Sequence, residues 1–299
     1  MNKDLACVIP AVFTTLNTDC SFDSHGMRKL VRYIVDGGMK TLFLLGFAGE
    51  SLALSREQRK EVIRTVREEV ADDVVIIAGV FDNATDLILN HVHDAKECGA
   101  NYVLATPTNF YPLRDCEIER LFIDVADQSP LPLIVYNCPL NRHYISSDII
   151  GRLAAHPNIA GLKQTSDLLK VEQMQLEVSS IENFTVLSGD EFAYFGSMAM
   201  GVEGFIIGGP GNVFPRKCLR IHENFKQGGL EEARIEYTNM IRFLFELYAL
   251  PFSEFAALKG MLEIAGICKR WVHKPVFSAN DEEMETVCAL MKKHNVAID

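Results

Sequence analysis

Apolar and polar positions along the chain form a repeating pattern, in which a short apolar run is followed by a segment of helical spacing. Short apolar runs bounded by Gly, Pro, Asp or Asn are typical of strands buried on both faces, as in parallel sheets. Helix signals separate the runs, for example Asp23 before the first helix and the capping box of Ser55 and Gln58 before the second. The runs cover residues 7–13, 41–45, 74–80, 102–105, 133–136, 159–163, 184–187 and 204–207. Eight such units favour a (β/α)8 barrel of the α/β class, a TIM barrel, over an open doubly wound sheet.

The last part of the chain lacks this alternation. After about Pro215 no further convincing strand is found, and we expect consecutive helices with breaks at Gly228-Gly229, Pro251 and Lys274-Pro275. We therefore predict a barrel that contains the active site over residues 1–216, and a C-terminal helical extension over residues 217–299. The Gly-Gly-Pro-Gly run at 208–211 allows two interpretations, an anion cradle or a flexible connection, of which we favour the connection.

The composition narrows the class of protein. With 48% hydrophobic residues in 299, the chain can bury a sizeable core. No apolar run reaches the roughly 18 residues of a membrane helix, and the N-terminus does not have the pattern of a secretory signal. The net charge of −11, without a dense basic cluster, argues against a nucleic-acid partner.

The eight cysteines form no C-x-x-C pair, and several, such as Cys7, Cys138 and Cys268, have apolar neighbours. Buried free thiols indicate a reducing compartment, so we expect a cytoplasmic protein without a membrane partner.

In a barrel of this kind the active site is formed by the carboxyl ends of the strands. Among the predicted ends only the sixth carries a lysine, Lys163, and the fifth carries Tyr136. A desolvated lysine loses its proton easily and can attack a carbonyl carbon, and a phenol can carry the protons that imine formation requires. Taken singly, Lys163 is more simply a surface residue at the start of a loop, and Tyr136 a half-buried aromatic at the rim. Together, at neighbouring strand ends, they indicate a Schiff-base site.

The turn at residues 46–51 is rich in glycine. Its backbone N–H groups can form a nest that binds a carboxylate, but it is equally a tight turn that places Glu50 near a helix N-terminus. Both interpretations stay open. His91 and His93 are two positions apart on a predicted helix, which is poor spacing for metal ligands, so we expect a solvated helix face. No metal-binding or nucleotide-binding motif is found, and we expect no metal and no cofactor.

These motifs together resemble the dihydrodipicolinate synthase / N-acetylneuraminate lyase family of class I aldolases, over nearly the whole chain. The resemblance rests on G-F-A-G-E-S at 46–51, T-P at 106–107, Y-N-C-P at 136–139, G-L-K-Q-T-S at 161–166 and S-G-D-E at 188–191. It implies a barrel with a helical C-terminal region, commonly in a homotetramer. It also implies that Lys163 forms an imine with pyruvate or another small 2-keto acid, without metal or organic cofactor, and that Tyr136 carries protons.

The resemblance further implies how the substrate is bound. Backbone N–H groups of the glycine-rich turn and around Ile206 would hold the substrate carboxylate. The expected substrate-binding residues are Phe47, Ala48, Gly49, Thr165, Asp190, Glu191 and Ile206.

Three positions depart from the family pattern. Phe47 and Ala48 stand where members usually have two hydroxyl residues, which bind the carboxylate and link the tyrosine into a proton relay. Asn109 stands where a second tyrosine is expected, although Tyr111 is close by. Residues that act as a unit lose orders of magnitude in rate when part of the unit is removed. A 2-keto-acid-binding protein with lost or altered turnover is therefore one alternative.

Two further features bear on the substrate. Synthases of the family usually place an arginine five residues after the tyrosine, where this chain has Asn141, with Arg142 next. Sialic acid lyases often show the L-K-Q-T-S form and an acidic pair such as Asp190-Glu191, whose carboxylates accept hydrogen bonds from hydroxyl groups. We therefore expect a lyase or aldolase on a sugar-derived 2-keto acid, N-acetylneuraminate lyase-like or 2-keto-3-deoxy sugar acid aldolase-like. The alternative is 4-hydroxy-tetrahydrodipicolinate (dihydrodipicolinate) synthase, which condenses pyruvate with aspartate semialdehyde.

Overall fold

The computed structural model describes residues 3–138 and 142–298, and a barrel of parallel strands lies at its centre. The strands of the described chain are β1 (Val8–Pro10), β2 (Thr41–Leu44), β3 (Val75–Gly79), β4 (Tyr102–Ala105), β5 (Leu133–Asn137), β6 (Ile159–Gln164), β7 (Thr185–Ser188) and β8 (Gly204–Ile207). Their order in the sheet is β1-β8-β7-β6-β5-β4-β3-β2, with every neighbouring pair parallel. A bridge between Ala11 and Phe43 joins β1 to β2 and closes the barrel. The predicted TIM barrel is confirmed.

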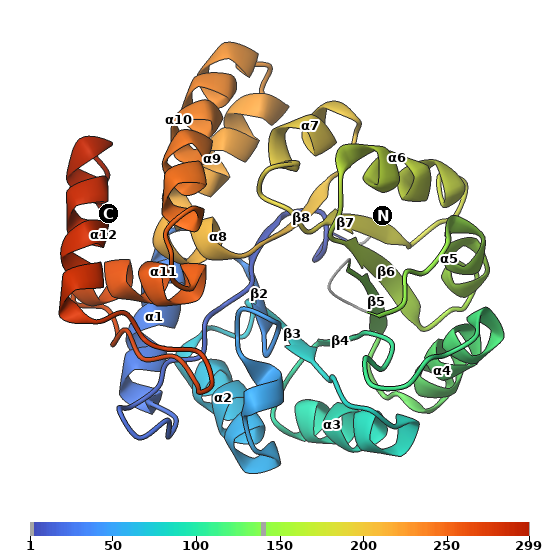
Figure 1. The fold of residues 1–299 in the computed structure, drawn as a ribbon. Helices are drawn as coiled ribbons and strands as arrows, with labels where there is room; N and C mark the ends of the chain where they lie inside the picture. Colours follow the sequence, from blue (N-terminus) through green and yellow to red (C-terminus); the bar gives the residue numbers. More distant parts are fainter. Residues whose placement is uncertain (1–2, 139–141, 299) are drawn as a thin grey trace.

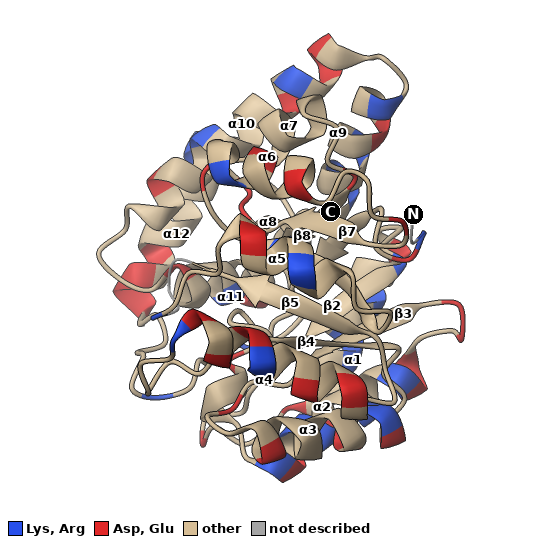
Figure 2. Cartoon of the chain, turned by 90° about the vertical axis from the view of Figure 1, so that its right-hand side faces the viewer, with Lys and Arg blue, Asp and Glu red and all other residues tan. Residues whose placement is uncertain are grey.

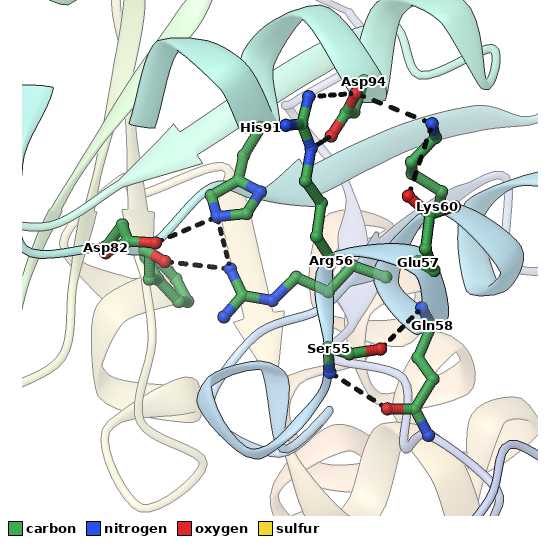
Figure 3. A network of polar contacts seen from close by, with 10 residues as sticks. Ser55, Arg56, Glu57, Gln58, Lys60, Asp82, His91 and Asp94 are labelled. Carbon is green, nitrogen blue, oxygen red and sulfur yellow. Dashed lines mark hydrogen bonds and ion pairs between the residues drawn. The ribbon is translucent and has the colours of Figure 1, made fainter. Parts of the chain in front are cut away.

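Helices surround the strands, as Figure 1 shows in a view along the barrel. They are α1 (Ser24–Asp36), α2 (Arg56–Glu69), α3 (Thr85–Glu97), α4 (Asp115–Gln128), α5 (Ser147–Ala154), α6 (Leu168–Glu177), α7 (Tyr194–Ala199) and α8 (Gly209–Val213), with a short 3-10 helix at Ser51–Ala53. The predicted caps are present, since the Asp23 side chain accepts the N–H of Gly26 and Ser55 and Gln58 form a capping box (Figure 3).

The C-terminal part is helical as predicted, with α9 (Pro215–Lys226), α10 (Leu230–Tyr248), α11 (Glu254–Ile264) and α12 (Asp281–Lys293). In Figure 1, α11 lies against the barrel beside α8, and α12 lies outside it. The boundary predicted at 216/217 falls inside the first turn of α9. Within the described residues, no helix is both long and apolar enough to cross a membrane.

Charged residues lie mainly in the outer layer of the fold. The strand residues are buried, except that Val75 and Ala160 are half-buried, and most Lys, Arg, Asp and Glu residues lie on the helices and loops around the barrel (Figure 2). This arrangement explains the continuous apolar runs of the sequence, because the inner face of each strand meets the other strands and the outer face meets helices.

Two local expectations are wrong. The Gly-Gly-Pro-Gly run at 208–211 is no flexible connection but leads into the buried helix α8, held by Asn212, whose side chain donates to Ala11 O at 2.8 Å. His91 does not lie on a solvated face. Its Nε2 is 3.0 Å from Arg59 Nη1. The same atom is 3.1 Å from Asp82 Oδ2, as Figure 3 shows. Burial, with the nearby Arg59, lowers the pKa of His91.

Candidate active site

Lys163 and Tyr136 lie side by side at the carboxyl ends of β6 and β5. They are register partners in the parallel sheet, so both side chains emerge on the same side. The Lys163 ammonium lies 4.1 Å from the centre of the Tyr136 ring and 5.3 Å from the ring of Phe43. Both side chains are buried, with 6% of each residue exposed. The amine is therefore enclosed by aromatic faces, which attract a cation but replace little of its hydration.

The residues that follow on the two strands fix this pairing. Asn137 donates to Gln164 Oε1 at 3.0 Å and to Ile145 O at 2.8 Å, and it accepts the N–H of Ile145 at 3.0 Å. Gln164 in turn donates to Ser166 Oγ at 2.8 Å. Because side chains alternate between the faces of a strand, this polar ladder on the other face holds Lys163 and Tyr136 in place.

The end of β7 leaves room for the lysine. A Cβ atom at Gly189 would lie 2.9 Å from Lys163 Cε and 2.2 Å from Thr165 Oγ1, so only glycine fits beside them. Thr165 Oγ1 donates to Gly189 O at 3.3 Å and also forms a hydrogen bond with the Tyr136 hydroxyl, which has Cys138 as another partner. The hydroxyl of Tyr136 therefore lies between Thr165 and the Cys138 thiol.

Two adjoining cavities open above the lysine. The inner one, of about 290 Å³, is lined by Lys163, Tyr136, Thr165, Cys138, Ala11, Phe47, Ala48, Gly189, Asp190, Glu191, Phe192, Gly208, Gly209, Tyr248, Glu254 and Phe255. The outer one, of about 320 Å³, shares Phe47, Tyr136, Cys138 and Phe255 with it and extends to residues 50–53 and 272–276. Of the two cavities, only the inner one is lined by Lys163.

Burial lowers the pKa of Lys163 to about 8, although the nearby Cys138 and Glu191 oppose the change. At about pH 7 roughly a tenth of the amine is then neutral and nucleophilic, far more than for a solvated lysine. Burial also raises the pKa of Tyr136, with a further contribution from Cys138. The phenol is thus a proton donor at neutral pH, and once ionised its oxygen is a strong base.

Two acidic residues, Asp190 and Glu191, line the same cavity as Lys163. Burial raises the pKa of Glu191, opposed mainly by the hydrogen bond that the Tyr248 hydroxyl donates to its carboxylate. Burial likewise raises the pKa of Asp190, whose Oδ1 accepts the N–H of Phe192 at 2.8 Å. Both residues line the inner cavity, where oxygen acceptors can meet hydroxyl groups of a ligand.

The structure brings together most of the residues expected from the sequence. Phe47, Ala48, Thr165, Asp190 and Glu191 all line the inner cavity with Lys163 and Tyr136. Gly49 and Ile206 do not line it: Gly49 lies behind Ala48, with its carbonyl accepting from Thr14 Oγ1 at 2.6 Å, and Ile206 is buried in β8. Gly208 and Gly209 line the cavity beyond β8 instead.

Of the positions that depart from the family pattern, Phe47 lines both cavities, Ala48 the inner one and Asn109 the outer one. The Phe47 ring is 56% exposed and packs edge-on against Phe255, with ring centres 5.3 Å apart. Asn109 lines the outer cavity, and its side-chain oxygen accepts the N–H of Arg142 at 3.2 Å. Tyr111 is exposed. Asn141 lies outside the described residues.

Sequence reasoning missed three residues of this region, all from the C-terminal part. Tyr248 on α10 holds Glu191, Phe255 on α11 lines both cavities, and Lys259 on α11 is fully buried and bonded to Glu50. No local motif marks them, because each is an ordinary helical position. The only available signal is a lysine inside the otherwise apolar run of α11.

The described residues contain no group of three or more His, Cys, Asp or Glu side chains that could hold a metal ion. All eight cysteines lie in the described part and are free thiols; Cys138 and Cys268 are buried as expected, and Cys7 is half-buried. The groups around Lys163 are an amine, a phenol, a threonine hydroxyl, a thiol and carboxylates. Such groups can transfer protons and attack a carbonyl carbon.

Comparison with known proteins gives relatives over nearly the whole chain. Residues 4–294 match the Dihydrodipicolinate synthetase family. A 4-hydroxy-tetrahydrodipicolinate synthase of Chlorobium limicola is 31% identical over 259 residues, which cover 85% of this chain and 87% of the relative. A Coccidioides immitis protein, provisionally named a mitochondrial 4-hydroxy-2-oxoglutarate aldolase, is 33% identical over 231 residues, or 75% of this chain and 73% of the relative.

Solved structures agree. A dihydrodipicolinate synthase of Bacteroides thetaiotaomicron superposes with a TM-score of 0.92 at 25% identity, covering 98% of this chain and 100% of the other. The shared fold and the extent of the sequence match leave one conclusion. The chain belongs to the dihydrodipicolinate synthetase family and is an enzyme of its lyase and aldolase class.

Proposed function

We propose that this enzyme forms a Schiff base between Lys163 and the ketone of pyruvate or of a larger 2-keto acid, and makes or breaks a carbon–carbon bond next to it. The observation that carries the proposal is the buried Lys163 amine, with a pKa of about 8, against the ring of Tyr136 in a cavity large enough for a small keto acid. A desolvated amine of this kind is the usual nucleophile toward carbonyl substrates.

In the cleavage direction the neutral Lys163 amine attacks the ketone carbon, and Tyr136 gives its proton to the departing hydroxyl, which leaves as water. The protonated imine then accepts the electrons of the breaking bond. The Tyr136 phenolate takes the proton of the hydroxyl on the departing carbon, which leaves as an aldehyde. The enamine that remains on Lys163 is protonated and hydrolysed to pyruvate. The raised pKa of Tyr136 suits both of its steps, since its phenol stays protonated until needed and its phenolate is a strong base.

The lining of the inner cavity supports a sugar-derived 2-keto acid as substrate. Asp190, Glu191 and Glu254 offer carboxylate oxygens to hydroxyl groups, and among the described lining residues the only cation is Lys163. A second substrate with its own carboxylate, such as aspartate semialdehyde or 4-hydroxy-2-oxoglutarate, would meet these acids at close range. The Chlorobium and Coccidioides relatives favour those two reactions, and the outer cavity contributes Lys274 and His273, so both remain the competing functions.

The first experiment is imine trapping. The protein is incubated with pyruvate, reduced with borohydride and digested, and the modified lysine is located by mass spectrometry. We expect the adduct on Lys163 and its loss in Lys163→Ala, while Lys170→Ala, an exposed lysine on the next helix, still forms it. An unmodified Lys163 would refute the proposal.

The second experiment assigns the substrate by pyruvate release from N-acetylneuraminate, from 2-keto-3-deoxy sugar acids and from 4-hydroxy-2-oxoglutarate, and by consumption of pyruvate with aspartate semialdehyde. We expect release from one of the sugar-derived acids. Trapping of pyruvate without turnover of any of these compounds would instead support a binding protein, which the absence of hydroxyls at Phe47 and Ala48 makes the third candidate.

Two further expectations belong to this proposal. We propose a homotetramer, as is common in the family, which light scattering coupled to gel filtration tests directly. We also propose a cytoplasmic location, which the eight free thiols support; cell fractionation tests it.

A further inference from the structure

A single buried ammonium group ties the glycine-rich turn after β2 to the C-terminal helices. Lys259 of α11 is 0% exposed, and its Nζ donates to Thr14 O at 2.8 Å, to Trp271 O at 2.9 Å and to the Glu50 carboxylate. The other oxygen of Glu50 accepts the N–H of His273 at 2.6 Å. The segment after β1, the turn after β2, α11 and the loop after α11 therefore all meet at this ion pair.

The same face of α11 also holds the other end of the turn. Phe255 precedes Lys259 by four residues, so the two side chains lie on one side of the helix. The Phe255 ring packs edge-on against Phe47, with centres 5.3 Å apart. Helix α11 thus contacts the turn at Phe47 and at Glu50, on either side of Ala48 and Gly49. We call this set of contacts, made by Phe255 and Lys259 to Phe47 and Glu50, the α11 clamp.

The turn between these contacts is built to present N–H groups. Among the described residues, the N–H groups of Phe47, Ala48 and Gly49 donate no hydrogen bond, whereas Glu50 N–H donates to Phe47 O at 3.0 Å. Glu50 itself has a left-handed backbone, with φ of 54°, which a non-glycine residue adopts only with support. Unpaired backbone donors beside a cavity are uncommon and form a nest for an anion.

We propose that Lys259, acting through Glu50, is a positioning residue that fixes the N–H groups of Phe47 and Ala48 for the carboxylate of the keto acid. The inference rests on the proposed function. Because Phe47 and Ala48 carry no hydroxyl, these two positions offer the carboxylate only their backbone N–H groups, and the direction of those groups decides its affinity. The stability of the fold does not by itself account for this ion pair, because apolar residues of similar size often stabilise a core as well as a buried ion pair does.

The test compares a charged with an uncharged ligand. Imine formation at Lys163 is measured by borohydride trapping over a range of concentrations of pyruvate and of methyl pyruvate, in which the carboxylate is a neutral ester. The variants are Lys259→Met, which removes the ammonium, and Glu50→Gln, which keeps the size of the side chain and removes its charge. Lys269→Met is the matched control, because this lysine lies just after α11 and is 65% exposed.

We expect both clamp variants to raise the half-saturating concentration of pyruvate by about tenfold or more, as for the loss of a charge-assisted hydrogen bond, and to leave that of methyl pyruvate unchanged. The control should change neither value. A purely structural role would weaken both ligands in parallel, and that result, or unchanged pyruvate binding in a folded variant, overturns the proposal. If Lys259→Met does not fold, the more conservative Glu50→Gln decides.

A failure of the proposed function gives a different result. In that case wild-type protein yields no adduct at Lys163 with either compound. The clamp is then tested by calorimetric titration of the same proteins with pyruvate: weaker binding in the clamp variants supports it, and equal or absent binding overturns it.

Discussion

Replacing Lys163 by methionine will abolish imine formation and at the same time stabilise the fold. Burial lowers the pKa of the amine from 10.5 to about 8, which measures how much the site disfavours the ammonium form. At about 1.36 kcal/mol per pKa unit, the difference corresponds to about 3 kcal/mol. Methionine is unbranched and of similar length, so it fills the same space between the Tyr136 and Phe43 rings without a charge.

The stability that Lys163→Met gains over the wild type decreases as the pH rises. Below about pH 8 the amine is protonated in both the folded and the unfolded protein, and the wild type bears the full penalty. Between about pH 8 and 10.5 the folded protein releases the proton first, so the wild type becomes more stable relative to the variant. Above 10.5 neither state carries the charge, and the advantage of Lys163→Met should be gone.

Urea unfolding at one fixed protein concentration measures the effect, at about pH 7 and again at about pH 10. Lys40→Met is the matched control, since this lysine is 64% exposed and should show no comparable gain. The reasoning is refuted if Lys163→Met is no more stable than wild type at about pH 7, or if its advantage is the same at both pH values.

Two variants test the electrostatics of the site, and one labelling experiment on the unchanged protein tests the burial of its cysteines. Tyr136→Phe should still give a trapped imine but lower the rate of pyruvate release by about 10² to 10⁴, and an unchanged rate would exclude Tyr136 as the proton carrier. Glu191→Gln should lower the pKa of Lys163 further, because the nearby carboxylate raises it. The pKa is measured by labelling Lys163 with trace acetic anhydride over a range of pH, followed by mass spectrometry. We expect the midpoint of labelling below about pH 8, and a higher midpoint would contradict this effect of Glu191. In the native protein Cys116, which is exposed, should react with iodoacetamide well before Cys268, whose pKa burial raises to about 12, and equal rates would contradict this burial.

The pairing of Lys163 with Tyr136 is accessible from the sequence because it depends on local signals. Strands buried on both faces give continuous apolar runs, and the residue that ends each run must lie at the rim of a parallel barrel. Counting the runs placed the two side chains on neighbouring strands, and the register of β5 and β6 agrees. Their chemical roles do not follow from that placement and stay predictions.

The α11 clamp is not accessible in this way. Lys259 and Glu50 are 209 residues apart, and neither has a sequence neighbour that signals the contact. His91 was misjudged for a similar reason, since its partners Asp82 and Arg59 come from other elements. Spacing along one helix describes which residues share a face, but not what packs against that face.

The prediction of a flexible connection at residues 208–211 is wrong for a different reason. Glycine and proline are typical of connections, but proline is also favourable in the first turn of a helix, where its missing N–H has no partner to lose. In α8 the deciding interactions come from the segment just after β1, where Phe13 N–H donates to Asn212 Oδ1 at 3.0 Å and Ala11 O accepts from the same side chain. A rule based on local composition cannot predict a contact between residues so far apart in the sequence.

The α11 clamp also limits how this chain can be recombined with its relatives. A chimaera whose crossover falls between residues 227 and 253 would take the turn with Glu50 from one parent and Lys259 from the other. Any mismatch there would leave a buried charge without its counter-ion, which is strongly destabilising. Shuffled libraries that exchange substrate loops should therefore take residues 46–50 and 255–273 from the same parent, although more than 200 residues separate them.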